Sequence, residues 1–165
     1  MEALLRAAVA VRRNAHAPYS RFPVGAAVLA EGRIYAGCNV ENSSFPLSVC
    51  AERNAVAAAI AAGARSIEAV AVVAGTSRPG PPCGGCRQVL AEFCAAGTRV
   101  LYAAAGGGSV ETTLGALLPE AFGAADLAAA GPLRAAAAGP TRGPRAAPSR
   151  RRNAPRRRGS RSSGG

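Results

Sequence analysis

Apolar and polar positions along residues 1–131 follow patterns that predict both helices and strands. Apolar side chains recur at helical spacing within residues 2–14, and helical runs without a breaker cover residues 50–62 and 83–95. The last of these runs has Gly97 as its predicted stop. Runs that are apolar and partly β-branched predict strands over residues 22–30, 34–38, 67–74, 99–103 and 109–113. Strands that alternate with helices indicate an α/β sandwich around a mixed sheet.

The composition changes sharply at Pro132. From this residue onward Ala, Pro, Gly, Ser and Arg dominate, and this segment holds half of the 20 basic residues and none of the acidic ones. The net charge of +11 therefore lies almost entirely in residues 132–165, whereas residues 1–131 are nearly neutral and long enough for one domain. The basic segment has too few large apolar side chains to offset the entropy of ordering, so we expect disorder. It can contact nucleic acid non-specifically through charge, but it lacks aromatic residues for base stacking.

Hydropathy and cysteine content indicate the cellular setting. Charged and polar residues interrupt every Ala-rich stretch, so no run is long enough to cross a bilayer, and Glu2 and Arg6 break a secretory pattern. We therefore expect a cytoplasmic protein without a membrane segment. In a reducing compartment, the 5 cysteines are thiols or metal ligands rather than disulfides.

Three cysteines have the spacing of a metal site. Cys50 begins one predicted helix, and Cys83 and Cys86 form a Cys-x-x-Cys pair, preceded by Pro82, at the start of another. The positive end of a helix dipole stabilises the thiolate form that binds metal. Two thiolates at this spacing can bind one zinc ion at about 2.3 Å, and three protein ligands leave the fourth position open, as in catalytic zinc sites. We therefore expect Cys50, Cys83 and Cys86 to bind Zn²⁺.

Glu52 and Arg53 follow the first of these cysteines. Glu52 is placed to move protons without binding the metal, and a Glu beside a zinc ligand, followed later by Pro-Cys-x-x-Cys, is the signature of zinc deaminases that act on nucleobases. Three thiolates make a zinc centre net negative, so some group must withdraw charge from the sulfurs. Arg53 and the two helix dipoles are the candidates. The Cys-x-x-Cys pair alone also fits redox and structural zinc sites.

Over roughly residues 5–127 the chain resembles the small homotetrameric zinc-dependent cytidine deaminases. The motifs that carry this resemblance occur in the family's order and are Pro18-Tyr19-Ser20, Phe22-Pro23-Val24-Gly25-Ala26-Ala27, Gly37-Cys38-Asn39-Val40-Glu41-Asn42, Cys50-Ala51-Glu52-Arg53 and Pro82-Cys83-Gly84-Gly85-Cys86-Arg87-Gln88. The resemblance implies a three-layer α/β/α sandwich with a mixed, roughly five-stranded sheet, and a homotetramer. It also implies hydrolytic deamination of free cytidine and deoxycytidine to uridine and deoxyuridine with release of ammonia. In this reaction of pyrimidine salvage, a zinc-bound hydroxide attacks C4 and Glu52 moves the protons.

The resemblance assigns substrate contacts residue by residue. It implies that Asn39 and Glu41 hydrogen-bond the ribose hydroxyls, that the ring of Phe22 packs near the pyrimidine, and that the backbone of Ala51 reads the amide edge of the base. A site built to bond a hydroxyl rejects an analogue that lacks it, which suits an Asn and a carboxylate.

Two further aromatic residues follow from the same resemblance. Phe122 matches the ring that reaches into the site of a neighbouring subunit, which implies that an isolated monomer is nearly inactive. Phe45 retains the aromatic ring that the family places in the loop before the first zinc ligand, so we expect it among the substrate contacts. Pro46, which follows it, departs from the family pattern.

The sequence is also compatible with two other functions, and several marked residues have structural explanations. One alternative is a deaminase of a modified cytosine compound such as blasticidin S, or of cytosine in RNA or DNA. A free nucleoside is favoured because a linked 3′ oxygen could not donate to Glu41. A second alternative is a non-catalytic zinc protein with a nucleic-acid-binding tail, which predicts four protein ligands and no role for Glu52. We expect His16 at the surface or in packing, and Cys38 and Cys94 in structural positions.

Overall fold

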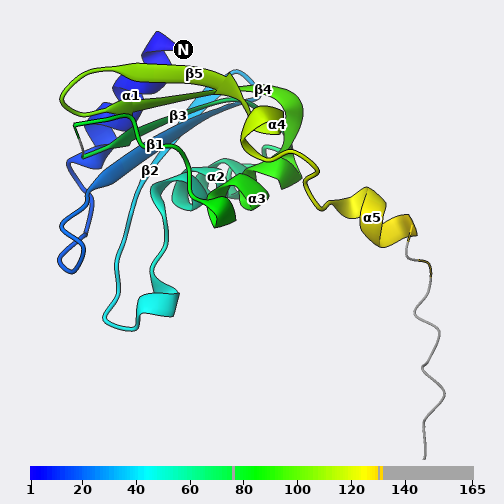
Figure 1. The fold of residues 1–165 in the computed structure, drawn as a ribbon, viewed down its shortest axis with the longest axis horizontal. Coiled ribbons are helices and arrows are strands. Elements are labelled where there is room, and N and C mark those ends of the chain that lie inside the picture. The colour runs from blue at the N-terminus through cyan, green and yellow to red at the C-terminus, as the bar shows by residue number, and fades with distance from the viewer. Residues whose placement is uncertain (76, 130, 132–165) are drawn as a thin grey trace, which may run out of the picture. The chain divides into compact units, whose positions relative to one another are not determined.

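The computed structural model describes residues 1–75, 77–129 and 131, in which one mixed sheet forms the centre (Figure 1). The strands are β1 (Val24–Ala30), β2 (Arg33–Cys38), β3 (Ile67–Ala74), β4 (Cys94–Ala104) and β5 (Ser109–Thr113). Their order in the sheet is β2-β1-β3-β4-β5. Strands β3 and β4 are parallel, and the other neighbouring pairs are antiparallel. The predicted mixed sheet of five strands is confirmed.

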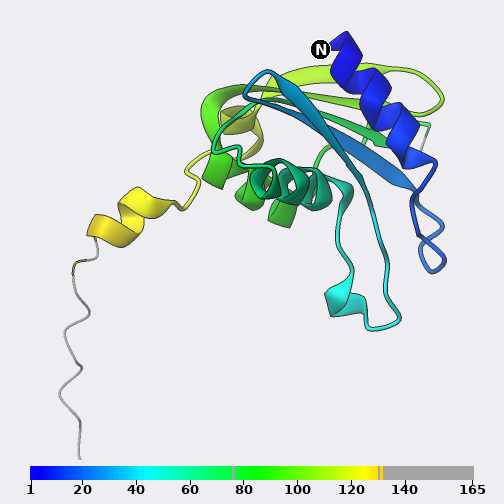
Figure 2. The ribbon, with the colours of Figure 1, turned by 180° about the vertical axis from the view of Figure 1, so that it is seen from behind.

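Helices cover both faces of this sheet, as Figures 1 and 2 show. The helices are α1 (Glu2–Arg12), the 3-10 turn η1 (Phe45–Leu47), α2 (Ala51–Ala61), α3 (Gly84–Phe93), α4 (Leu114–Leu117) and α5 (Ala124–Ala129). Helix α1 lies on one face, while α2 and α3 lie on the other, so the three-layer α/β/α arrangement is also confirmed. Within the described part of the chain, none of these helices has the length and apolar character that a bilayer crossing needs.

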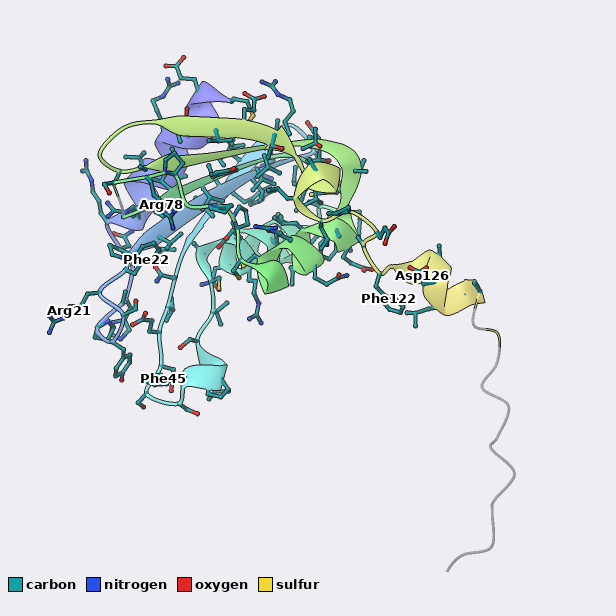
Figure 3. All side chains as sticks on the ribbon, in the orientation of Figure 1. Arg21, Phe22, Phe45, Arg78, Phe122 and Asp126 are labelled. Carbon is teal, nitrogen blue, oxygen red and sulfur yellow. The ribbon has the colours of Figure 1, made fainter. Side chains whose placement is uncertain are left out.

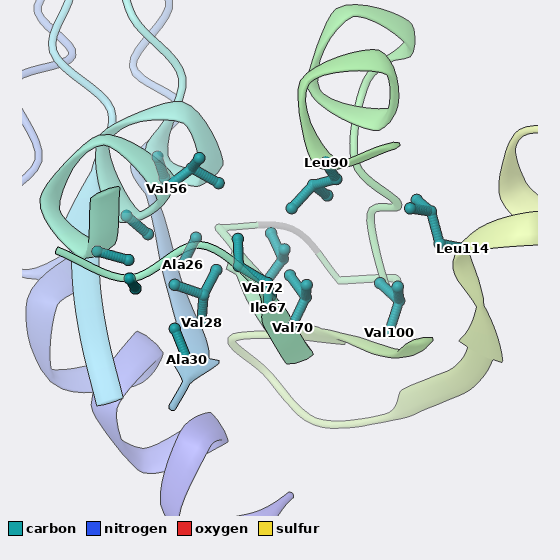
Figure 4. Close-up of a cluster of buried hydrophobic side chains, with 14 residues drawn as sticks. Ala26, Val28, Ala30, Val56, Ile67, Val70, Val72, Leu90, Val100 and Leu114 are labelled. Carbon is teal, nitrogen blue, oxygen red and sulfur yellow. The ribbon is translucent and has the colours of Figure 1, made fainter. Parts of the chain in front are cut away.

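The two faces of β1 and β3 contribute to two separate apolar clusters. Val28 and Val70 point toward α2 and α3 and belong to the larger cluster, in which Leu90 is fully buried (Figure 4). Ala27 and Ala71 point the other way and pack beneath α1. Because helices cover both faces, these central strands are continuous apolar runs rather than alternating ones. Burial on both sides fixes the strand register, and the register fixes where the strand ends meet the loops.

Gly37 allows α2 to approach the sheet closely. A Cβ atom at this position would lie 2.5 Å from the backbone nitrogen of Ala55 and 2.7 Å from the carbonyl oxygen of Ala51. Both contacts are to backbone atoms that cannot move without shifting the helix. The absent side chain therefore places the first turn of α2 directly against β2, beside Cys50.

The boundary between α3 and β4 differs from the sequence prediction. The helix predicted over residues 83–95 ends at Phe93, and the strand predicted over residues 99–103 already begins at Cys94. Cys94 has an extended backbone, with φ of −114° and ψ of 145°, and it pairs with Ile67 of β3. Pairing with a neighbouring strand therefore overrides the local helical preference. The predictions for residues 132–165 lie outside the described residues.

Candidate active site

The three predicted zinc ligands meet at the starts of two helices. Cys50 is the N-cap of α2 and Cys83 is the N-cap of α3, and both have extended backbones, while Cys86 lies in the first turn of α3. Their sulfur atoms all lie within 4.8 Å of one another. A tetrahedral zinc ion with Zn–S bonds of about 2.3 Å would hold sulfurs about 3.8 Å apart, so the three thiols fit this metal. Cys86 is buried and Cys83 is exposed, which leaves the group open on one side.

The thiols influence one another's proton affinity. A hydrogen bond from the Cys86 thiol is the main cause that lowers the pKa of Cys50 to about 6, and the positive charge of Arg53 also lowers it. The same hydrogen bond and burial raise the pKa of Cys86 well above its usual range. The hydrogen bond therefore favours the thiolate form of Cys50 and the protonated form of Cys86. Because a metal binds thiolates, metal binding displaces this proton.

Glu52 lies in the first turn of α2, directly beside the ligand group. Its side chain is only 5% exposed, and burial raises the pKa of its carboxyl group. An interaction with the Cys86 thiol acts in the opposite direction but is a smaller effect. A raised pKa makes a carboxylate a better proton acceptor, which is a property that a general base needs.

A cavity of about 400 Å³ opens next to Glu52. Its wall combines apolar side chains with a few polar groups, as is typical of small-molecule sites. Predicted site residues line it together, namely Phe22, Asn39, Glu41, Cys50, Ala51, Glu52 and Cys83. Sequence reasoning missed the remaining lining residues, which are Ser20, Val24, Val72, Ala74, Gly80 and Pro81. Apart from Ser20 these residues have no reactive side chain, so only the fold reveals them.

Asn39 lines the cavity, and its side chain is hydrogen-bonded to the backbone at the start of β1. Its Oδ1 accepts a hydrogen bond of 2.8 Å from the backbone N–H of Val24, and its Nδ2 donates one of 3.0 Å to the carbonyl of Phe22. An amide has two N–H donors, and among the described residues one of them is bonded to the carbonyl of Phe22, which leaves the other for a ligand. The side chain that is predicted to contact the sugar thus also fixes the position of Phe22.

Phe45 and Phe122 are not among the residues that line this cavity (Figure 3). Phe45 is 67% exposed on η1, its ring centroid lies 5.5 Å from that of Tyr19, and it lines a neighbouring cavity with Glu41. Phe122 is 59% exposed between α4 and α5, and its carbonyl accepts a hydrogen bond of 2.7 Å from Nε2 of Gln88. Within this single chain, neither ring lines the cavity beside the three cysteines.

Arginine residues support the ligand loops from outside the cavity. The guanidinium of Arg87 donates 2.8 Å hydrogen bonds to the carbonyls of Pro82 and Leu117, so it ties the residue before Cys83 to α4. Arg53 is exposed on α2 and acts on Cys50 through charge.

The comparisons with known proteins agree with this site. The sequence model described as "Cytidine and deoxycytidylate deaminase zinc-binding region" matches residues 1–103. A cytidine deaminase of Sporosarcina psychrophila is 50% identical over 131 residues, which cover 79% of this chain and 96% of that protein. A cytidine deaminase of Mycobacterium tuberculosis is 44% identical over 115 residues, which cover 69% of this chain and 83% of that protein.

Solved structures show the same similarity. The crystal structure of a cytidine deaminase from Burkholderia pseudomallei superposes with a TM-score of 0.70 at 47% identity, covering 73% of this chain and 98% of that chain. The crystal structure of a cytidine deaminase from Mycobacterium tuberculosis gives a TM-score of 0.64 at 41% identity, covering 74% and 96% respectively. Fold and sequence thus point to the same group of proteins.

Proposed function

The chain belongs to the cytidine and deoxycytidylate deaminase family, and from this premise we propose that it hydrolyses free cytidine and deoxycytidine to uridine and deoxyuridine. The reaction consumes water and releases ammonia, which fits a role in pyrimidine salvage. One observation carries the proposal. The buried carboxyl of Glu52 and the thiols of Cys50 and Cys83 line the same cavity as Asn39 and Glu41, so catalytic and sugar-binding chemistry converge in one site.

The mechanism assigns proton transfer to Glu52. Zinc held by Cys50, Cys83 and Cys86 would lower the pKa of a water molecule at its open position toward neutrality. Glu52 would accept the two protons of the attacking water in turn, giving the first to N3 and the second to the amino group, which leaves C4 as ammonia. Burial supports this role because it raises the pKa of the carboxyl, which favours uptake of a proton. Arg53 assists by withdrawing negative charge from Cys50.

The remaining cavity residues position the nucleoside. Phe22 offers its ring to the pyrimidine, and the backbone of Ala51, which is fully buried, offers hydrogen-bonding groups to the edge of the base. Asn39 retains a free N–H, and Glu41 is an acceptor, so a sugar with free hydroxyls matches both. A nucleotide within RNA or DNA has no 3′ hydroxyl to donate to Glu41, which disfavours a polymer substrate.

We also propose that the enzyme is a homotetramer in which Phe122 completes the site of a neighbouring subunit. The support is its position. This ring is 59% exposed, and the side chain of Gln88 fixes the backbone of the same residue by donating a hydrogen bond to its carbonyl. Phe45, which is 67% exposed near the second cavity, would also contact substrate or a neighbour once the assembly forms.

We further propose that the enzyme is cytoplasmic and that its basic C-terminal segment contacts nucleic acid. A cytoplasmic location suits the site because a reducing compartment keeps Cys50, Cys83 and Cys86 available as thiols. The Arg-rich residues 132–165 would contact nucleic acid non-specifically, since they carry ten positive side chains and no negative one. Such contact should weaken steeply as salt concentration rises, and removal of residues 132–165 should abolish it without changing deamination.

Substrate comparison tests the proposed function against its alternatives. Zinc-loaded full-length protein is incubated separately with cytidine, deoxycytidine, blasticidin S and a cytosine-containing single-stranded DNA, and ammonia release is measured for each. We expect release with the two nucleosides and at least about 100-fold less with the other two, since sites that bond a substrate hydroxyl can discriminate by about 10⁴–10⁵-fold. Release with blasticidin S alone would instead identify a deaminase of modified cytosines. Absence of release from all four would favour the non-catalytic zinc protein.

A further inference from the structure

Three hydrogen bonds from one short turn hold the carboxylate of Glu41. The backbone N–H groups of Tyr19 and Ser20 donate to Oε2 at 2.9 Å and 3.2 Å, and the hydroxyl of Ser20 donates to Oε1. These residues lie more than 20 positions apart in the sequence, so only the fold brings them together. A carboxylate that is merely solvated on a surface loop does not have three protein donors.

The backbone of the same turn also fixes the segment that carries Glu41. The N–H of His16 donates to the carbonyl of Asn39 at 3.0 Å, and the N–H of Glu41 donates to the carbonyl of His16 at 2.8 Å. Beyond this pair, the turn closes on itself through a 3.1 Å hydrogen bond from the Arg21 N–H to Ala17, and Arg21 has a φ of +54°. The left-handed Arg21 marks the point where the chain reverses toward Phe22 (Figure 3).

The hydroxyl of Ser20 has a defined direction. The backbone N–H of Phe22 donates to Ser20 Oγ at 3.1 Å, so this oxygen is an acceptor toward Phe22 and a donor toward Glu41. Ser20 therefore connects the residue proposed to contact the base with the residue proposed to contact the sugar. Both the main cavity and the neighbouring one include Ser20 and Glu41 in their walls, so this contact lies where the two cavities meet.

The carboxylate of Glu41 has one hydrogen-bond acceptor position that the turn does not occupy. An ionised carboxylate has about four acceptor positions, and the turn occupies three of them. Oε2 receives two donors and Oε1 receives one, so the remaining position is on Oε1. A group that docks there must be a donor, which a sugar hydroxyl is and an ether or phosphate oxygen is not.

The turn also keeps Glu41 ionised. The hydrogen bond from Ser20 is the largest cause that lowers the pKa of Glu41, the N–H groups of Tyr19 and Ser20 add to it, and the charge of His16 contributes last. An ionised carboxylate accepts only, whereas a protonated one also donates. The requirement for a donor in the substrate therefore extends to lower pH than an unsupported glutamate would permit.

We propose that Ser20 is the positioning residue that aims the last free acceptor of Glu41 at a sugar hydroxyl, and that it thereby sets the preference for nucleosides with a free 3′ hydroxyl. This inference rests on the proposed function, since it concerns how the same site selects its sugar. Ser20 acts through Glu41 and takes no part in the proton transfers. Its replacement should therefore alter the recognition of the sugar much more than the chemical step.

Steady-state kinetics of zinc-loaded variants test this role. Ser20→Ala should lower kcat/KM for cytidine about 3- to 10-fold, mainly by raising KM. This is the size expected for one ordinary hydrogen bond, because the contact is exposed to solvent. The same variant should leave kcat/KM for 3′-deoxycytidine nearly unchanged, because that substrate lacks the hydroxyl concerned. Ser20→Thr keeps the hydroxyl and should restore most of the preference. Ser43→Ala is the matched control and should behave as the wild type. It removes a hydroxyl from the loop that carries Glu41, and the hydrogen bonds to the Glu41 carboxylate among the described residues come from Tyr19 and Ser20 instead.

The pH profile gives a second readout that a purely structural role would not move. Loss of the Ser20 hydrogen bond raises the pKa of Glu41. The ratio of kcat/KM for cytidine to kcat/KM for 3′-deoxycytidine, in which the titration of Glu52 cancels, should therefore begin to fall at a higher pH in Ser20→Ala than in the wild type. If Ser20→Ala lowers kcat/KM equally for cytidine and 3′-deoxycytidine, or lowers neither, the inference is overturned while the proposed function stays intact. Failure of the wild-type protein to deaminate either nucleoside would overturn both.

Discussion

Replacement of Glu52 by Gln separates proton transfer from metal binding. The side chain is 5% exposed and fills the wall of the cavity, so a residue of the same size preserves packing while it removes the ability to accept and return a proton. One positioned acid and base contributes about 10²–10⁴-fold in rate. Because one carboxyl serves every proton transfer here, we expect a loss of about 10³–10⁴-fold in kcat, or about 4 to 5.5 kcal/mol of activation free energy.

Initial rates of uridine formation, followed by ultraviolet absorbance and combined with metal analysis, measure this prediction. Glu52→Gln should keep its zinc, since the three thiols hold the metal without the carboxyl. Glu92→Gln changes an exposed glutamate on α3 and is the matched control, with activity expected to equal that of the wild type. Retention of a tenth or more of the wild-type kcat by folded Glu52→Gln would refute the assigned role. Loss of zinc would show that the carboxyl belongs to the ligand set.

Further predictions follow from the ligands, the core and the assembly. Cys83→Ala should lose zinc and activity together, measured by metal analysis and turnover, whereas a zinc-loaded active variant would contradict its role. Leu90→Ala should lower the free energy of unfolding by about 2–5 kcal/mol in chemical denaturation, because the side chain is fully buried. Phe122→Ala and Glu52→Gln should each be nearly inactive alone. Their co-assembly should recover activity, because hybrid sites combine an intact Glu52 with a neighbour's Phe122; no recovery would place Phe122 in its own subunit's site.

The pairing of Cys83 with Cys86 and the position of Glu52 beside Cys50 were predictable because local spacing determines them. Cys50 and Glu52 are separated by one residue at a helix start, and Cys83 and Cys86 by two, so each pair has nearly the same geometry in any fold that forms those helices. The helix ends themselves follow from Gly63 and Pro82, which are local signals. The distance between Cys50 on α2 and the Cys83–Cys86 pair on α3 could not be predicted from spacing, because it depends on how the two helices pack.

Contacts that depend on tertiary structure were beyond the reach of the sequence. The hydrogen bond between Ser20 and Glu41 joins two loops whose spacing follows no pattern, and Ser20 has no signal beyond its place in a matching motif. Likewise, Cys94 lies in a locally helical stretch, and only its pairing with Ile67 makes it extended. The position of Phe45 outside the main cavity depends in the same way on how the loop with η1 folds.

Zinc-dependent turnover of cytidine tests the central claim most directly. Purified full-length protein is incubated with cytidine, and uridine and ammonia are measured before chelation, after removal of zinc, and after zinc is restored. We predict equal amounts of the two products, loss of turnover on chelation, and recovery on addition of zinc to the thiols of Cys50, Cys83 and Cys86. Folded, zinc-loaded protein that leaves cytidine unchanged, or turnover that persists after complete removal of zinc, would contradict the account.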